Sequence, residues 1–379
     1  MASFARDCVG HLFALCANEV PFFYLSVGVY SEAILVTPCT YNMIRVAING
    51  FGRIGRLFFR QAFGSQDIEI VAINDLGSVE NLAYLLEHDT TYRGYGKTVR
   101  ADAQKGTLAV DGKEVKFLQQ KDPLQLPWKD LAIDVVLEST GIFESFEKAK
   151  VHIDAGAKHV LITAPAKDED GPAGKTVLMG INGEVAKTYS ITSNASCTTN
   201  GASPVIAVLS KTPGIAKAIL TTVHAYTSTQ SMVDGPVRGD DYRRGRAGAQ
   251  NIVPSTTGAA IAVTRAIPEL VGKFDGIAIR VPVVTGSLVD VTFVAKRSTT
   301  VEEINTILKN AAADPRWRGI LGVTDEQLVS SDIIGMPYAS LVDTRLTKVI
   351  DGDLVKVSAW YDNEWGYTTT LVKHVLALA

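Results

Sequence analysis

Short apolar runs alternate with helical stretches in the first half of the chain, beginning immediately after Met43. We predict strands at residues 44–49, 68–74, 134–138, 159–163 and 188–193, with a first helix that runs through Phe63. Strands that alternate with helices are typical of a parallel sheet covered by helices. The first half of the chain is therefore predicted to be a parallel α/β domain.

The pattern changes after about residue 198. A helix to Ser210 is followed by longer strands at 218–226, 276–283, 288–296 and 354–361, whose polarity partly alternates. These features predict an α+β second domain with a mostly antiparallel sheet. The irregular segment 227–249 is rich in Gly, Asp and Arg, and structureless loops of this length are usually functional. We expect a last helix at 367–379 to pack back on the first domain.

Composition excludes several classes of partner. The chain has 379 residues, 46% of them hydrophobic and 20% charged, with a formal net charge of −3. This balance predicts a globular protein of two domains and no partner among nucleic acids or anionic membranes. The short basic run at 243–246 is either a solvated loop or an anion-binding or inter-subunit contact.

The cysteines are unevenly placed. Cys8, Cys16 and Cys39 lie in the first 42 residues, and Cys197 is the single cysteine that follows. One cysteine builds no disulfide framework, so we expect a reduced, cytoplasmic protein. Residues 1–42 are more acidic than a transit peptide should be, and we predict an extension outside the fold; a targeting or anchoring role is the alternative.

A glycine-rich turn predicts a dinucleotide site. Gly50-x-Gly52-x-x-Gly55 follows an apolar strand and opens a helix, and Asp75 ends the next strand. Glycines allow the backbone to approach a pyrophosphate, and a helix N-terminus supplies free N–H groups. A carboxylate at Asp75 would bind ribose hydroxyls and repel a 2′-phosphate, which favours NAD over NADP. A turn used only for tight packing is the alternative.

The segment SNASCTTN at 193–200 sets one thiol among small and polar residues. Cys197 is predicted at or just before a helix N-terminus, where the helix dipole favours the thiolate. His224 lies late in an apolar strand that opens onto the long loop, and its imidazole is a candidate base for this thiol. Arg280 lies within an apolar strand, where it either binds an anion or forms a structural ion pair. From these residues alone it stays open whether His224 contacts Cys197, and which of the two roles Arg280 has.

From Met43 to the end, the chain resembles glyceraldehyde-3-phosphate dehydrogenase, the phosphorylating, NAD-linked glycolytic family. The resemblance is carried by INGFGRIGR, the ND pair at 74–75, ESTGIF, SNASCTTN, TTVHAYT, STTGAA and WYDNEWGY. It implies oxidation of glyceraldehyde 3-phosphate to 1,3-bisphosphoglycerate with NAD and inorganic phosphate, through a thiohemiacetal and a thioester. Where the family usually has a second cysteine this chain has Gly201, which excludes an internal disulfide with Cys197.

The resemblance also implies residue roles, with Cys197 as the nucleophile and His224 as its base. Groups that hold the substrate phosphate and inorganic phosphate are expected at Ser196, Thr198, Thr227, Arg246, Thr257, Gly258 and Arg280. NAD contacts are expected at Gly50, Gly52, Arg53, Ile54, Gly55, Asp75, Lys121, Thr163 and Asn363. No metal site is expected. Segment 227–249 resembles the family's S-shaped loop, which lines a neighbouring subunit's cofactor site in a homotetramer.

We therefore expect an NAD-binding domain of Rossmann type at 43–196, completed by a C-terminal helix at 363–379, and a catalytic domain at 197–362. The nearest alternative is a related dehydrogenase of another phosphorylated aldehyde such as erythrose 4-phosphate, because the same residues would grip either phosphate. Semialdehyde dehydrogenases should lack SNASCTTN and WYDNEWGY. A protein that binds NAD without catalysis predicts damage to Cys197 or His224, and both are intact.

Overall fold

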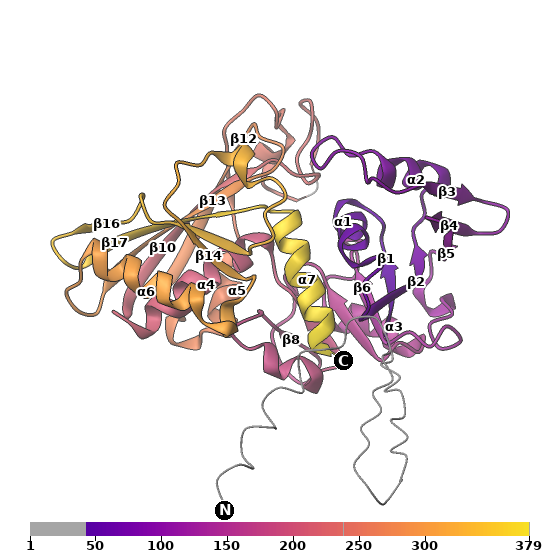
Figure 1. The fold of residues 1–379 in the computed structure, drawn as a ribbon, viewed down its shortest axis with the longest axis horizontal. Coiled ribbons are helices and arrows are strands. Elements are labelled where there is room, and N and C mark those ends of the chain that lie inside the picture. The colour runs from indigo at the N-terminus through magenta and orange to yellow at the C-terminus, as the bar shows by residue number, and fades with distance from the viewer. Residues whose placement is uncertain (1–42, 238, 379) are drawn as a thin grey trace, which may run out of the picture. The chain divides into compact units, whose positions relative to one another are not determined.

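The computed structural model describes residues 43–237 and 239–378, so the expected extension at 1–42 lies outside the described residues. Within that part of the chain, a sheet of nine strands forms the first half (Figure 1). Its order is β3 (Val99–Asp102), β4 (Thr107–Val110), β5 (Lys113–Leu118), β2 (Ile68–Asn74), β1 (Ile44–Asn49), β6 (Val135–Glu138), β7 (His159–Ile162), β9 (Ile191–Ser193) and β8 (Lys175–Thr176). The helices of this half are α1 (Arg53–Ala62), α2 (Val79–Glu87) and α3 (Phe146–Asp154).

The centre of this sheet is parallel, as the sequence predicts. Strand β1 pairs in parallel with β2 and β6, and its residues are almost entirely buried. Parallel strands covered on both faces are apolar throughout, which is why this part of the sheet was visible in the sequence. The antiparallel strands β3, β4 and β5 at one edge were not predicted, because they are short and their side chains are half exposed.

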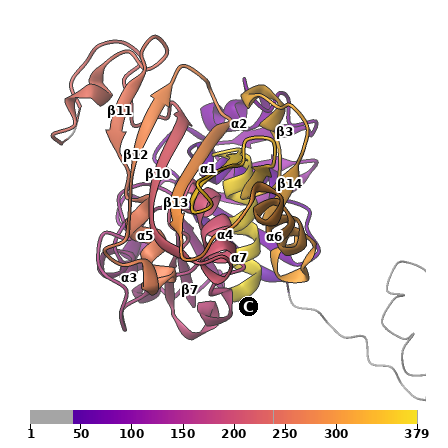
Figure 2. The ribbon, with the colours of Figure 1, turned by 90° about the vertical axis from the view of Figure 1, so that its left-hand side faces the viewer.

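The second sheet is mostly antiparallel, and Figure 2 shows β11, β12, β10 and β13 side by side. Within the described residues its order is β11 (Val253–Thr256), β12 (Phe274–Val281), β10 (Ile215–Ala225), β13 (Ser287–Ala295), β17 (Leu354–Tyr361), β15 (Ser340–Asp343) and β14 (Leu321–Thr324), with β16 (Lys348–Ile350) beside β17. The helices are α4 (Cys197–Lys211), α5 (Ala259–Ala266), α6 (Val301–Ala313) and α7 (Trp365–Leu378). Two strand pairs, β10–β12 and β14–β15, are parallel.

Some predicted boundaries were wrong. The expected strand at 188–193 begins at Ile191, because a 3₁₀ helix occupies Gly183–Thr188. The last helix begins at Trp365 rather than at 363 or 367, since the carboxylate of Asp362 accepts hydrogen bonds from the N–H groups of Glu364 and Trp365. No helix of the described residues is long and apolar enough to span a bilayer.

Helix α7, yellow in Figure 1, packs against α1 and α4. Its His374 is fully buried, and Nδ1 donates to the amide oxygen of Asn194 at 3.0 Å while Nε2 has no partner. The Asn194 amide in turn donates to Thr370 at 2.9 Å. Burial lowers the pKa of His374 to about 3, so the folded protein holds this ring neutral.

This burial predicts acid sensitivity. Between about pH 6.5, the ordinary value for histidine, and pH 3, the unfolded chain binds a proton that folded His374 does not, so the free energy of unfolding falls as pH falls. We expect His374→Gln, which keeps a donor for Asn194, to make this fall shallower by up to about 1.4 kcal/mol per pH unit. Denaturant titrations between pH 7 and 5 measure the slope. The exposed His88 gives the control His88→Gln, and equal slopes for His374→Gln and wild type would contradict the prediction.

Candidate active site

Cys197 is the first residue of α4, as predicted from the sequence. The hydroxyl of Ser196 caps this helix by accepting a hydrogen bond from the Thr199 N–H at 3.0 Å. The residue before the cap, Ala195, is fully buried with a φ of +54°, which is strained for a side chain with a Cβ. Its carbonyl accepts a hydrogen bond from the Tyr367 hydroxyl at 2.9 Å, so α7 helps to hold the turn that presents the thiol.

His224 lies near the end of β10 with Nε2 3.3 Å from the sulfur of Cys197. Its other ring nitrogen, Nδ1, is 2.6 Å from the carbonyl oxygen of Ala225. With the proton on Nδ1, this contact is a hydrogen bond to the carbonyl, and the lone pair of Nε2 faces the thiol. The guanidinium of Arg280, 2.7 Å from Nδ1, can only donate and would require the lone pair there instead. In the first of these tautomers the histidine is oriented as a base toward Cys197.

Strand pairing places Arg280 beside His224. In the parallel register of β10 and β12 it is the partner of His224. Its Nη1 lies 3.2 Å from the carbonyl of Ala225 and 2.7 Å from Nδ1 of His224. No carboxylate forms a salt bridge with Arg280 among the described residues, so the structural ion pair that the sequence left open is absent there. This guanidinium remains available to an anion.

Tyr361, at the end of β17, ties these elements together. Its hydroxyl lies 3.0 Å from the Thr198 hydroxyl on α4 and 2.8 Å from that of Thr222 on β10. Its ring packs edge-on against His224, with centroids 5.9 Å apart. On its other side, a Cβ at Gly201 would lie 3.1 Å from the Tyr361 ring, so the absence of a side chain at 201 leaves room for this packing.

The glycine turn is closely packed. Gly50 has a φ of +95°, and a Cβ there would lie 2.7 Å from the Ser139 backbone. A Cβ at Gly55 would lie 2.2 Å from the Gly50 carbonyl oxygen, so α1 approaches the turn at a distance that only glycine permits. The carboxylate of Asp75 accepts hydrogen bonds from the N–H groups of Phe51 and Gly77 at 2.7 and 2.8 Å.

A cavity of ≈280 Å³ opens beside this turn. Its lining comes from four strand ends of the first sheet and includes Asn49, Gly50, Gly52, Asn74, Asp75, Lys121 and Thr140. Gly52 provides no side-chain cap, and within the described residues the N–H groups of Arg53 and Ile54 have no protein acceptor. Free N–H groups at a helix N-terminus bind phosphate, so the cradle fits the pyrophosphate of a dinucleotide.

Asn363, another predicted NAD contact, does not line this cavity and is held by residues of the second sheet. Its amide oxygen accepts hydrogen bonds from the Thr285 hydroxyl, the Gly286 N–H and the Ser287 hydroxyl at 3.2, 3.2 and 2.9 Å. These three donors fix which way the amide faces. Among the described residues its nitrogen has no hydrogen-bond partner, which leaves an N–H donor for a ligand carbonyl.

Comparisons with known proteins agree with this geometry. A family model described as "Glyceraldehyde 3-phosphate dehydrogenase, NAD binding domain" matches residues 44–146, and one described as "Glyceraldehyde 3-phosphate dehydrogenase, C-terminal domain" matches residues 196–363. The glyceraldehyde-3-phosphate dehydrogenase of Streptomyces coelicolor is 48% identical over 332 residues, which are 87% of this chain and 96% of that protein. That of Zymomonas mobilis is 47% identical over 339 residues, 89% of this chain and 98% of the relative. The chain belongs to the glyceraldehyde-3-phosphate dehydrogenase family.

Membership of the glyceraldehyde-3-phosphate dehydrogenase family confirms several predictions. The family, the α/β fold class with one mostly parallel and one mostly antiparallel sheet, and the NAD-binding domain are all as the sequence led us to expect. The chain is an NAD-dependent oxidoreductase of this family. The comparisons do not address individual residues, so their roles remain predictions.

Other predicted residues are engaged in the protein itself. The hydroxyl of Thr163 donates to the Glu138 carbonyl, and Thr257 accepts from the Ala259 N–H beside Gly258, which caps α5. The Thr227 hydroxyl lies 2.9 Å from that of Thr229. Arg246 forms an exposed ion pair with Asp234, and it makes no hydrogen bond to Cys197, His224 or Arg280 within the described residues.

Arg244 is a site candidate that sequence reasoning did not single out from the basic run at 243–246. It lies close enough to His224 and Arg280 for its charge to lower the pKa of both. Its guanidinium contacts Ser255 and Asp241 at 2.9 and 3.4 Å. The loop carries several arginines without periodicity, so no sequence signal distinguishes this one from its neighbours.

Burial opposes the thiolate that the helix N-terminus is expected to favour at Cys197. Burial raises the pKa of Cys197, although the charge of Arg280 and hydrogen bonds from Thr198 act in the opposite direction. Burial, and then the charge of Arg280, lower the pKa of His224 to about 3. Burial is the largest influence on both groups, and it disfavours the charged form of each.

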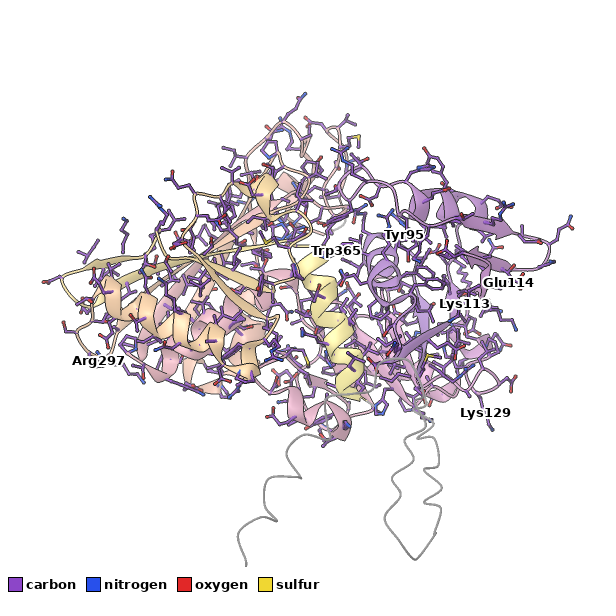
Figure 3. All side chains as sticks on the ribbon, viewed as in Figure 1. Tyr95, Lys113, Glu114, Lys129, Arg297 and Trp365 are labelled. Carbon is purple, nitrogen blue, oxygen red and sulfur yellow. The ribbon has the colours of Figure 1, made fainter. Side chains whose placement is uncertain are left out.

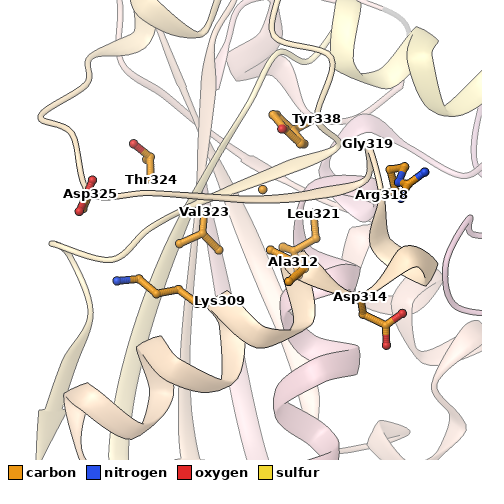
Figure 4. A pocket seen from close by; sticks show the side chains of 12 residues that line it. Lys309, Ala312, Asp314, Arg318, Gly319, Leu321, Val323, Thr324, Asp325 and Tyr338 are labelled. Atoms are coloured by element: carbon orange, nitrogen blue, oxygen red, sulfur yellow. The ribbon is translucent and has the colours of Figure 1, made fainter.

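A separate pocket lies between α6 and β14, lined by Lys309, Arg318, Tyr338 and neighbouring residues (Figure 4). Cationic and acidic side chains share its rim, since Asp314 and Asp325 also line it. None of the predicted site residues contributes to this lining. This pocket is therefore separate from the candidate active site.

These charges predict how the thiol titrates. Because the guanidinium of Arg280 lowers the pKa of Cys197, we expect Arg280→Gln to move the midpoint of Cys197 alkylation by iodoacetamide upward by about one pH unit. Mass spectrometry of the peptide that contains Cys197 separates it from Cys8, Cys16 and Cys39. Arg297→Gln, an exposed arginine paired with Glu303, is the control. An unchanged midpoint in Arg280→Gln would show that this charge does not reach the sulfur.

Proposed function

We propose that the chain catalyses the phosphate-dependent oxidation of glyceraldehyde 3-phosphate to 1,3-bisphosphoglycerate with NAD, in glycolysis. The observation that supports this most strongly is the 3.3 Å contact between the Cys197 sulfur and Nε2 of His224 beside an arginine without an ion-pair partner among the described residues. A thiol, a base and an anion-binding guanidinium at one point are the groups that a phosphorylating aldehyde dehydrogenase requires.

The first step is attack of the Cys197 sulfur on the aldehyde carbon. His224 takes the thiol proton at Nε2 as the carbon–sulfur bond forms, and returns it to the former carbonyl oxygen to give a thiohemiacetal. The neutral state of both groups suits this transfer, because Nε2 offers a lone pair and no charge is created before substrate arrives. The step requires the tautomer in which Nδ1 carries the proton and donates to the carbonyl of Ala225.

Oxidation follows on the same sulfur. The hydride of the thiohemiacetal carbon would leave to the nicotinamide ring, the acceptor that NAD would supply when bound. His224 takes the hydroxyl proton in the same step, so the carbonyl re-forms as a thioester on Cys197. We propose that Asn363, held by its amide oxygen, donates its N–H to the nicotinamide carboxamide and so orients the ring. The cradle of Gly50, Gly52 and Gly55 would hold the pyrophosphate, together with N–H groups of Arg53 and Ile54.

Inorganic phosphate then attacks the thioester carbon, and the carbon–sulfur bond breaks to release an acyl phosphate and restore Cys197. We propose that the adjacent charges of Arg280 and Arg244 bind the phosphate groups of substrate and nucleophile. Hydroxyl and N–H donors are proposed to complete the two sites, from Ser196, Thr198, Thr227, Thr257 and Gly258. Arg246 would join them only if its pair with Asp234 opens.

We propose a homotetramer in the cytoplasm. One face of the second sheet is covered by α4, α5 and α6, whereas Ile219 on β10 and Ile277 on β12 are 56% and 49% exposed on the other. Such an apolar sheet face is typical of a surface buried against another subunit. Met232, Val233 and Tyr242 of the long loop are also exposed, which supports a role of this loop at a subunit contact. Sedimentation velocity of the full chain tests the state.

We also propose the domain division stated above. The NAD-binding domain would comprise 43–196, and α7 would complete it because Gln61 of α1 donates to Trp365 and Thr368 at its start. The catalytic domain would comprise 197–362. The family matches at 44–146 and 196–363 support this division.

NADH formation by the purified full chain tests the activity. We expect sustained turnover with glyceraldehyde 3-phosphate, NAD and inorganic phosphate, and a single stoichiometric burst when phosphate is omitted, because the thioester then persists. We expect Cys197→Ser to lose both, and His224→Gln to lower kcat about 10²–10⁴-fold, the usual contribution of a positioned base. Binding of NAD to both variants serves as the control for folding.

Two outcomes would contradict the proposal. Sustained turnover without phosphate would mean that water accepts the acyl group and that the phosphate assignments are wrong. Faster turnover with erythrose 4-phosphate than with glyceraldehyde 3-phosphate would assign the chain to the alternative substrate.

A further inference from the structure

The guanidinium of Arg53 joins two distant parts of the chain. Arg53 is the first residue of α1, at the glycine turn, and its side chain forks onto the carboxylate of Glu364 through Nε at 3.0 Å and through Nη2. Its Nη1 donates to Asp89, whose carboxylate is 4% exposed. The Arg53 guanidinium is therefore paired with two carboxylates of the protein, and its side chain is not available to bind a cofactor phosphate.

Glu364 directly follows Asn363, the predicted NAD contact that is held by residues of the second sheet. The N–H of Glu364 donates to the carboxylate of Asp362 at 2.9 Å, and the Tyr92 hydroxyl donates to the same oxygen at 2.7 Å. Residues 362–364 are thus held from the first sheet's side by Arg53 and Tyr92. The donors at 285–287 hold Asn363 from the second sheet.

Docking of helix α7 does not depend on this ion pair. Gln61 of α1 donates to the Trp365 carbonyl at 3.0 Å and to the Thr368 hydroxyl at 2.6 Å, and accepts from Thr369 at 3.0 Å. Trp365, labelled in Figure 3 at the start of α7, also packs against Tyr92, with ring centroids 5.3 Å apart. These contacts already attach α7 to the first half of the chain. The Arg53–Glu364 pair therefore affects mainly the position of residues 362–364, which precede the helix.

We propose that Arg53 and Glu364 are positioning residues that fix Asn363 relative to the glycine turn, so that the two ends of NAD are bound at one set distance. The proposal rests on the proposed function, because it takes NAD as the ligand that spans the turn and Asn363. The backbone N–H of Arg53 faces the pyrophosphate cradle while its side chain restrains Glu364, so one residue contributes to both ends. A bidentate arginine–carboxylate pair suits this task because its planar geometry restricts direction as well as distance.

Glu364→Gln tests the pair while keeping the size of the side chain. Isothermal titration calorimetry of the full chain with NAD measures binding without turnover. We expect the Kd for NAD to rise about tenfold, as when one charge-assisted hydrogen-bonded pair is lost. In an Asn363→Ala background the same substitution should change the Kd by less than about twofold, because the pair would act through Asn363.

A matched control is available. Arg297 and Glu303 form a similar fork in the second half of the chain, with Nη2–Oε1 and Nη1–Oε2 distances of 2.5 and 3.1 Å. Glu303→Gln removes an equivalent charge pair, and we expect it to leave the Kd for NAD and kcat at wild-type values. With [1-²H]glyceraldehyde 3-phosphate, Glu364→Gln should also show a larger deuterium isotope effect on kcat, since a displaced nicotinamide slows hydride transfer.

The outcomes separate the proposals. Wild-type protein that neither binds NAD nor oxidises the aldehyde would overturn the proposed function itself. An active wild type with an unchanged Kd in Glu364→Gln, or with equal effects in the two backgrounds, would overturn the positioning role alone. If Glu364→Gln does not fold, Arg53→Lys provides the second variant, because it keeps the cation and loses the fork. A wild-type Kd in folded Arg53→Lys would equally contradict the role of the fork.

Discussion

The parallel register of β10 beside β12 is the constraint on which the candidate active site depends. It makes His224 the strand partner of Arg280, and the first turn of α4 then sets the sulfur of Cys197 against the free side of the imidazole. A shift of one residue in this register would turn one of the two side chains to the opposite face of the sheet. The surroundings of the thiol therefore depend on the backbone pairing of two strands that do not contain it.

Burial and charge act against each other at this point. Burial favours a neutral thiol and a neutral imidazole, while the guanidinium of Arg280 stabilises the anion and disfavours a cationic ring. The resulting pair carries no charge of its own until a substrate approaches. Tyr361 keeps the geometry constant, because its hydroxyl joins the helix that bears Cys197 to the strand that bears His224.

Features formed by consecutive residues could be predicted from the sequence, whereas contacts between distant segments could not. The turn at Gly50 and the helix start at Cys197 were predictable because strand, turn and helix follow one another directly along the chain. The contact between Cys197 and His224 was left open by spacing alone and was favoured only by the family resemblance. The positions of Arg244 and Glu364 and the raised pKa of Cys197 depend on how distant strands and loops come together, for which the sequence carries no periodic pattern.

The strained turn before the nucleophile also has a consequence for biosynthesis. Ala195 is held at positive φ, and the hydroxyl that secures its carbonyl belongs to Tyr367, in the last helix of the chain. The neighbouring Asn194 likewise depends on His374. On the ribosome, residues 194–197 are made well before either partner has been translated, so the turn gains its final hydrogen bonds only after α7 has been made. A polypeptide truncated before α7 would contain every residue proposed for chemistry and still lack the support that sets the thiol in place.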